Sequence, residues 1–533
     1  MTSASKPPTR PYALLKQNLS PIRHKLEIGD ADILIYVITF VRQYLWIVSN
    51  NSLAWVFTVL LSALIWVVHL RTRDRSTEST PFQYWLIVAV PLFAIYAMRA
   101  AFPDTTFDVL DYRLINAERA LRGFPLIAGD FFPTRFPFNP ASDMVTGVVR
   151  HVFGYRLGTI INYLVVLWIG SIIDRLLRPY LENRWLRSAS VLLLLLTEHV
   201  IFVINNYMVD LLALPLLLEA ARLSFETKSK QSGSAVRVGL YLGASVAFKL
   251  TNLAFALPIL LVYLHKTILQ ESHRQRLRHL LFVVLAFVVP ILPFTLYIFW
   301  QTGNPVFPLY NKIFQSPFWP TDDFVGVRWS PVVDDPRWLN MRWWEQLLWP
   351  ILLPFKLDHT AGALGPHAGR ISLAFIAAFL GLLLRTMDRK VRALSFMTLF
   401  GAVLWSAISG MLRYGTYIEL AGGVVVVYLT ARLYEAKDSE AWRILRRAAA
   451  VFVLGILILQ SAVACLYVYK FEWGSRPTFF EQPKAYVRDS KFFFRDYSLG
   501  NFLSQRERVL LSPVEAWAET NALESGIEAL LKP

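Results

Sequence analysis

The sequence predicts an all-α polytopic membrane protein of about 11–13 transmembrane helices joined by extracytoplasmic loops. Of its 533 residues, 55% are hydrophobic and 14% are aromatic. Only 17% are charged, against about 25% in ordinary soluble proteins. Mean hydropathy is +0.42. These observations exclude a disordered chain and argue against a soluble enzyme.

Apolar runs approaching the length needed to cross a bilayer define the predicted spans. The pair at 238–251 and 253–265 is short, so it is either two spans or a re-entrant or broken pair. The first 32 residues are polar and basic, which predicts no cleavable signal peptide. The predicted spans are 33–49, 53–70, 82–98, 157–174, 188–204, 208–221, 238–251, 253–265, 280–300, 371–384, 394–411, 415–431 and 449–469.

The formal net charge of +16 is explained by topology and does not require a nucleic-acid partner. With the N-terminus in the cytoplasm, Lys and Arg are about twice as dense in the inner segments as in the long outer ones. We therefore predict a plasma or inner membrane protein whose site is extracytoplasmic. The expected segments are 1–81, an N-terminal cytoplasmic part with the first helices; 82–300, a membrane core containing the first outer loop 99–156; 301–370, an outer loop with an interfacial helix; 371–469, the last helices; and 470–533, an outer tail.

Four ionisable residues lie inside predicted spans, where charge is costly and usually functional. Arg42 is expected to snorkel or to pair helices. Glu198 fits a pairing role as well as a functional one. Asp210 and Lys249 are expected at similar depth near the outer surface, as a neutralising pair that either serves a site or only joins helices. Cys465 is the single cysteine, so neither an internal disulfide nor a cysteine metal site is expected.

The outer loops carry further candidates. In the first loop, Asp108, Asp111, Tyr112 and Arg113 begin a helical stretch that would place carboxylates beside guanidiniums, unless it is only a surface helix with ion pairs. The second loop holds six of the 17 tryptophans within 319–349, which is typical of the membrane interface. The run 347–355 is too short to span and is predicted to lie in that interface.

Several short motifs, in this order, resemble bacterial polytopic glycosyltransferases of the GT-C superfamily, which use polyprenyl-phosphate sugars. The resemblance covers about residues 80–430. Arg113 stands where the family often has His, Ile115 where it often has Pro, and the second acidic residue of its loop would be Asp111 or Glu118. The motifs are Phe107-Asp108-Val-Leu-Asp-Tyr112-Arg113, Tyr207-Met-Val-Asp210, Phe248-Lys249-Leu-Thr251-Asn252, Thr302-Gly-Asn304-Pro-Val-Phe-Pro308 and Arg413-Tyr414.

The resemblance implies transfer of a sugar from a polyprenyl-phosphate donor to a hydroxyl of a glycan, lipid or protein, without a cofactor or metal. It implies Asp108 as general base, with Asp210 in support. It places Lys249 and Arg413 near the donor phosphate. The remaining candidates for substrate binding are Asp111, Tyr112, Arg113, Asn304 and Tyr414.

Three other functions are consistent with a chain of this kind. A flippase for lipid-linked glycans would share the helices, but this chain shows no half-to-half repeat. An O-antigen-type polymerase or ligase would have its large outer loop late in the chain. A non-catalytic relative serving as a structural subunit of a membrane complex is the third alternative.

Overall fold

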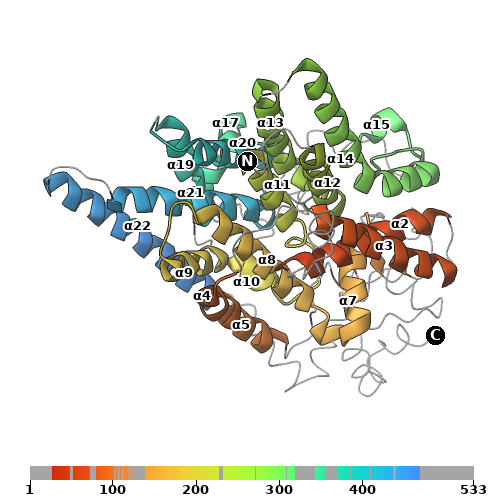
Figure 1. Ribbon diagram of the computed structural model, residues 1–533, viewed down its shortest axis with the longest axis horizontal. Coiled ribbons are helices and arrows are strands. Elements are labelled where there is room, and N and C mark those ends of the chain that lie inside the picture. The colour runs from red at the N-terminus through yellow and green to blue at the C-terminus, as the bar shows by residue number, and fades with distance from the viewer. Residues whose placement is uncertain are drawn as a thin grey trace, which may run out of the picture.

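The computed structural model describes residues 27–48, 52–72, 80–100, 139–226, 232–270, 272–307, 309–318, 342–355, 369–384, 386–408, 410–435 and 440–467, together with single positions between 104 and 121. All regular elements in this part of the chain are helices. A helix overlaps each of the thirteen predicted spans, so the all-α prediction is confirmed. Figure 1 shows the helices arranged around α8 and α11.

The N-terminal half contributes α2 (Asp30–Val48), α3 (Ser52–Thr72), α4 (Phe82–Tyr84), η1 (Trp85–Ala89), α5 (Val90–Ala100), α7 (Ala141–Leu157), α8 (Ile160–Leu177), α9 (Arg184–Leu195), α10 (Glu198–Val203), α11 (Leu214–Glu226) and α12 (Ser232–Phe248). The rest comprises η3 (Leu250–Asn252), α13 (Leu253–Gln270), α14 (His273–Thr302), α15 (Asn311–Phe314), α17 (Trp343–Leu347), α18 (Trp349–Leu352), η4 (Leu353–Phe355), α19 (Arg370–Leu383), α20 (Arg389–Ile408), η6 (Leu412–Gly415), α21 (Thr416–Glu435) and α22 (Glu440–Tyr467).

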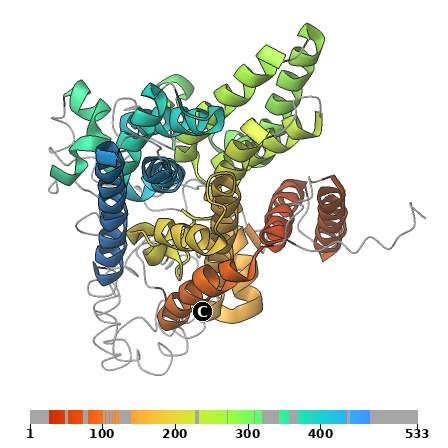
Figure 2. The ribbon, with the colours of Figure 1, turned by 60° about the vertical axis from the view of Figure 1, so that its left-hand side comes forward.

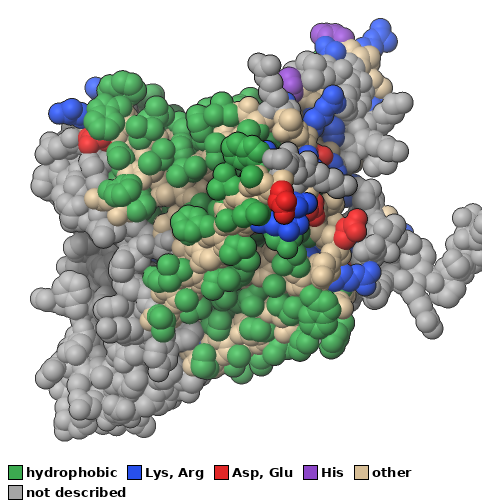
Figure 3. Space-filling view, turned by 90° about the vertical axis from the view of Figure 1, so that its left-hand side faces the viewer, with side chains coloured by type: hydrophobic (Ala, Val, Ile, Leu, Met, Phe, Trp, Pro, Cys, Tyr) green, Lys and Arg blue, Asp and Glu red, His purple; other side chains and the backbone are tan. Residues whose placement is uncertain are grey.

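The chain is a polytopic membrane protein. Within the described residues, eight helical segments are long and apolar enough to cross a membrane, and α12 and α19 are shorter apolar helices. Hydrophobic side chains cover much of the described face in Figure 3, with charged groups mainly toward its edges. Such a face is suited to contact with lipid chains rather than water.

Helices α8 and α21 form the buried centre, with nearly three quarters of each apolar window inside the molecule. Their side chains join one continuous hydrophobic core. The first and last helices lie on opposite sides of this centre, α2 and α3 on one and α22 on the other (Figure 2). Arg42 on α2 is buried, and its guanidinium carbon lies 4.8 Å from the ring centre of Trp55 on α3. Its predicted helix-pairing role is thereby confirmed.

Local sequence signals explain where several helices begin and end. Ser272 and Gln275 form a capping box at the start of α14. That helix ends at Gly303, whose φ of 73° is a left-handed conformation that glycine adopts without steric cost. The short pair of predicted spans is resolved as α12 and α13, separated by an extended Lys249 and the single turn η3.

The segment 347–355 forms short helical turns rather than one interfacial helix. Trp349 is fully buried there, and its indole Nε1 donates to the Gly410 carbonyl at 2.9 Å. Trp343, in contrast, is exposed. Of the described tryptophans in this loop, Trp349 therefore anchors the fold and Trp343 faces outward.

Candidate functional site

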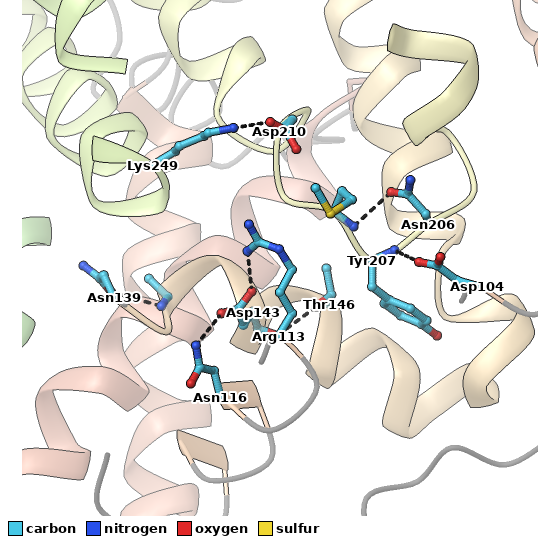
Figure 4. A network of polar contacts seen from close by, with 12 residues as sticks. Asp104, Arg113, Asn116, Asn139, Asp143, Thr146, Asn206, Tyr207, Asp210 and Lys249 are labelled. Carbon is cyan, nitrogen blue, oxygen red and sulfur yellow. Dashed lines mark hydrogen bonds and ion pairs between the residues drawn. The ribbon is translucent and has the colours of Figure 1, made fainter. Parts of the chain in front are cut away.

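The candidate site begins with an ion pair between two helix ends. Asp210 lies in the turn that precedes α11, and Lys249 lies between α12 and η3. The Lys249 ammonium donates to the Asp210 carboxylate, as Figure 4 shows, and both side chains are largely buried. The neutralising pair predicted from the sequence is confirmed. Asn252 stabilises the break after α12 by donating to the Ser245 carbonyl at 3.0 Å.

The start of α21 adds an aromatic ring and a second cation. The Lys249 ammonium lies 3.4 Å from the ring centre of Tyr414, and the Arg413 guanidinium carbon lies 5.3 Å from the same ring. Both Arg413 and Tyr414 belong to η6, which is positioned by the indole of Trp405 donating to the Met411 carbonyl at 2.9 Å. Lys249 and Arg413 therefore lie beside the same aromatic ring, and their placement near a donor phosphate stays a prediction.

A second ion pair comes from the first outer loop. The Arg113 Nη1 donates to Oδ1 of Asp143 on α7 at 2.9 Å, and Asn116 contacts the other carboxylate oxygen at 3.4 Å (Figure 4). The described positions of this loop helix form one mostly buried face that includes Val109 and Ala117. This spacing agrees with the predicted helix. Asp108, Asp111 and Tyr112 lie outside the described residues.

Electrostatics join the two ion pairs into one cluster, which we call the cationic cluster: Arg113, Asp143, Asp210, Lys249, Arg413 and Tyr414. Lys249 pairs directly with Asp210, and the positive charge of Arg413 also acts on that carboxylate. Arg113 acts in the same direction. Burial raises the pKa of Asp143 despite the opposing effect of Arg113.

The loop before α11 is shaped by polar contacts that the sequence analysis did not identify. The Asp104 carboxylate accepts from the backbone N–H of Tyr207 at 2.7 Å. Asn162 on α8 donates to the carbonyls of Val203 and Asn206 at 3.0 and 2.6 Å. These contacts fix the chain just ahead of Asp210.

The sequence analysis also did not identify Asp143 as a candidate. The signal available was an acidic residue in the first turn of α7, three positions after Pro140, inside an outer loop already identified as a candidate. Its partner Arg113 could not be assigned from spacing, because the two residues come from different helices.

Asn304 lies apart from the contacts that define the cationic cluster. It is fully buried, its amide nitrogen donates to the Leu309 carbonyl at 2.9 Å, and its amide oxygen accepts from Val306 N–H at 2.9 Å. The side chain thus holds the turn after α14. A role for Asn304 in substrate binding stays a prediction.

The arrangement can bind an anion. The described members of the cluster include three cations, Arg113, Lys249 and Arg413, and two carboxylates, Asp143 and Asp210. One positive charge is therefore left over. A phosphate accepts several hydrogen bonds and suits such a surplus. Carboxylate and imidazole groups close enough together to ligate a metal occur elsewhere in the described chain, at the break between α9 and α10.

No family model and no curated protein matches the chain. Among solved structures, it is similar to ArnT from Cupriavidus metallidurans bound to undecaprenyl phosphate, with 13% identity, a TM-score of 0.43 and coverage of 73% of this chain and 76% of that one. It is also similar to the same protein in the apo state, with 16% identity, a TM-score of 0.40 and coverage of 76% and 75%.

Proposed function

We propose that this membrane protein transfers a sugar from a polyprenyl-phosphate donor to an acceptor hydroxyl on the extracytoplasmic side, with inversion at the anomeric carbon. The observation that carries the proposal is the cationic cluster. It combines a net positive charge with burial at the ends of apolar helices, where the headgroup of a lipid would enter from the membrane.

The cluster provides what departure of a lipid phosphate requires. The acceptor oxygen forms a bond to the anomeric carbon while the bond from that carbon to the phosphate oxygen breaks. Negative charge then grows on the departing phosphate, and fixed cations stabilise it. Arg413 has a guanidinium fork that matches two phosphate oxygens, whereas Lys249 supplies a point charge.

The acceptor hydroxyl must lose a proton in the same reaction. We assign this step to Asp108, which is the first acidic residue of the motif in the first outer loop. Asp210 is less suited to it, because its carboxylate is already engaged by the Lys249 ammonium. Asp210 instead supports the reaction by holding Lys249 in place.

The orientation of the protein is part of this proposal. Asp210 precedes α11, Lys249 follows α12 and Arg413 precedes α21, so the cluster gathers at matching ends of three helices. With a cytoplasmic N-terminus, these ends face outward.

The test is sugar transfer by the purified full chain in lipid nanodiscs, using radiolabelled polyprenyl-phosphate sugars and a panel of lipid and glycan acceptors. We expect lipid phosphate to be released in equal amount to sugar transferred. Movement of the donor across a vesicle membrane without breakage of its sugar–phosphate bond would instead support a flippase. Donor binding with neither outcome across the panel would support a non-catalytic subunit.

A further inference from the structure

Three buried side chains meet where a membrane helix is interrupted. The helix α9 ends at Leu195, and Thr197 restarts the chain as α10 by accepting the N–H of Val200 at 3.3 Å. Glu198 and His199 are therefore the first residues of α10. Glu419 approaches them from the first turn of α21.

The three side chains are almost completely removed from the surface, with 2–3% of each exposed. One potential ligand atom from each lies within 4.8 Å of the others. His199 Nδ1 is 3.7 Å from Glu419 Oε1, and neither ring nitrogen has a hydrogen-bond partner in the described chain. Two carboxylates this close in a buried place are stabilised by a cation near them.

Arg370 is a candidate for that cation, because its charge interacts with both carboxylates, but its Nη2 donates to other acceptors. Its Nη2 donates to the carbonyls of Leu193 and Leu457 at 2.8 and 3.2 Å and to Ser461 Oγ at 2.6 Å. Among the described residues it forms no ion pair within 4.0 Å of Glu198 or Glu419. Arg370 therefore joins the end of α9 to the C-terminal half of α22, while its charge also acts on both carboxylates without a direct ion pair.

We propose that Glu198, His199 and Glu419 bind a divalent transition-metal ion, with Zn²⁺ the best match to one imidazole and two carboxylates. Ligand atoms about 2.0–2.2 Å from Zn²⁺ in tetrahedral geometry lie about 3.4 Å apart. The 3.7 Å between His199 and Glu419 is near that separation, and it is longer than a direct N–H···O hydrogen bond of about 2.7–3.2 Å. Two positive charges would neutralise both carboxylates.

The ion would join α10 to α21 beneath the cationic cluster. Glu419 is six residues after Arg413 in the sequence, which corresponds to about 9 Å along a helix. The metal would therefore fix the start of α21, and with it η6, against the α9–α10 break. Three protein ligands leave a fourth position for water or another ligand.

The experiment uses the full chain purified with an affinity tag that contains no histidine. Elemental analysis is expected to find about one zinc per chain after dialysis against metal-free buffer. After the zinc is removed with a chelator, Co²⁺ should restore one equivalent and produce the visible absorption of a tetrahedral site. Zn²⁺ should raise the temperature of unfolding of the stripped protein.

The diagnostic variants are His199→Ala and Glu419→Gln, the second of which preserves the size of the side chain. Each should weaken Co²⁺ binding by more than about 100-fold, the upper range for loss of a group that only supports a ligand. The matched controls are His279→Ala and Glu219→Gln, which alter a buried His on α14 and a buried Glu on α11. They should keep wild-type metal content.

Wild-type protein with no zinc and no Co²⁺ absorption would overturn the site, even if the variants failed to fold. Equal metal content in wild type, His199→Ala and Glu419→Gln would overturn it as well, because the ion would then lie elsewhere. Neither measurement requires sugar transfer, so the metal site and the proposed function can fail separately.

Discussion

Arg413 and Lys249 both carry a positive charge, but they are held differently. Lys249 is already committed to Asp210 and rests on the Tyr414 ring, with a distance of 3.4 Å from its ammonium to the ring centre. Arg413 is adjacent to the same ring at 5.3 Å, and its charge also acts on Asp210. The proposed function assigns the planar fork of Arg413, which Lys249 lacks, to the lipid phosphate.

This difference leads to a prediction for Arg413. Replacing it with Lys keeps the charge but removes the planar fork, so binding of polyprenyl-phosphate donor should weaken although net charge is unchanged. Arg413→Ala should weaken it further. Titration of fluorescent lipid phosphate into nanodisc-embedded protein measures the effect, with Arg432→Lys at the other end of α21 as control. Wild-type affinity in both Arg413 variants would reduce this residue to an interface anchor.

A second prediction concerns the general base. Asn matches Asp in size but cannot take up a proton, so Asp108→Asn should slow transfer by about 100-fold or more while leaving donor binding intact. Asp111→Asn should have a smaller effect, since we expect Asp111 to orient the loop. Single-turnover assays on folded protein separate the two steps. Near-normal turnover in Asp108→Asn would move the assignment to Asp111 or Asp143.

At the scale of helices, the closest packing lies between α12 and α14. An added Cβ at Gly243 would lie 2.1 Å from the Phe287 carbonyl oxygen, and one at Gly239 would lie 2.4 Å from that of Val283. Small residues four positions apart allow two membrane helices to approach this closely. Since Lys249 directly follows α12, this contact also determines where its ammonium is presented.

The prediction is that Gly243→Ala destabilises the fold by about 1–3 kcal/mol, the usual cost of overpacking. Gly233→Ala, in the same helix, is the control because a Cβ added at that position would have no atom within 4 Å. It should be neutral or slightly stabilising, since Ala favours a helix over Gly. Thermal unfolding in detergent compares the two. Equal melting temperatures would mean that α12 and α14 are less tightly packed.

For the molecule as a whole, the distribution of Lys and Arg predicts which side faces outward. In a Cys465→Ser background, a cysteine at Lys312 should react with a membrane-impermeant maleimide on intact cells, whereas one at Glu182 should react only after lysis. Both positions are exposed, unlike Ser316, which is buried in the same loop. The reversed labelling pattern would invert the orientation and place the cationic cluster at the cytoplasmic surface.

The helical architecture and much of the cationic cluster were accessible from the sequence for physical reasons. A bilayer requires long apolar helices, so composition and run length predict them. Charged residues near their ends are costly enough to be conspicuous, which is why Asp210, Lys249 and Arg413 could be named in advance. Asn304 was equally conspicuous, but its amide is used within its own turn.

Partners from distant parts of the chain required the folded molecule. No local pattern links Arg113 to Asp143 or His199 to Glu419, because each pair comes from separate helices whose relative rotation is determined by packing. The same holds for the break at Leu196 and Thr197, which lies inside a run that reads as one apolar span. Hydrophobic periodicity reports which residues avoid water, whereas the contacts between helices depend on shape and close approach, which only the tertiary structure decides.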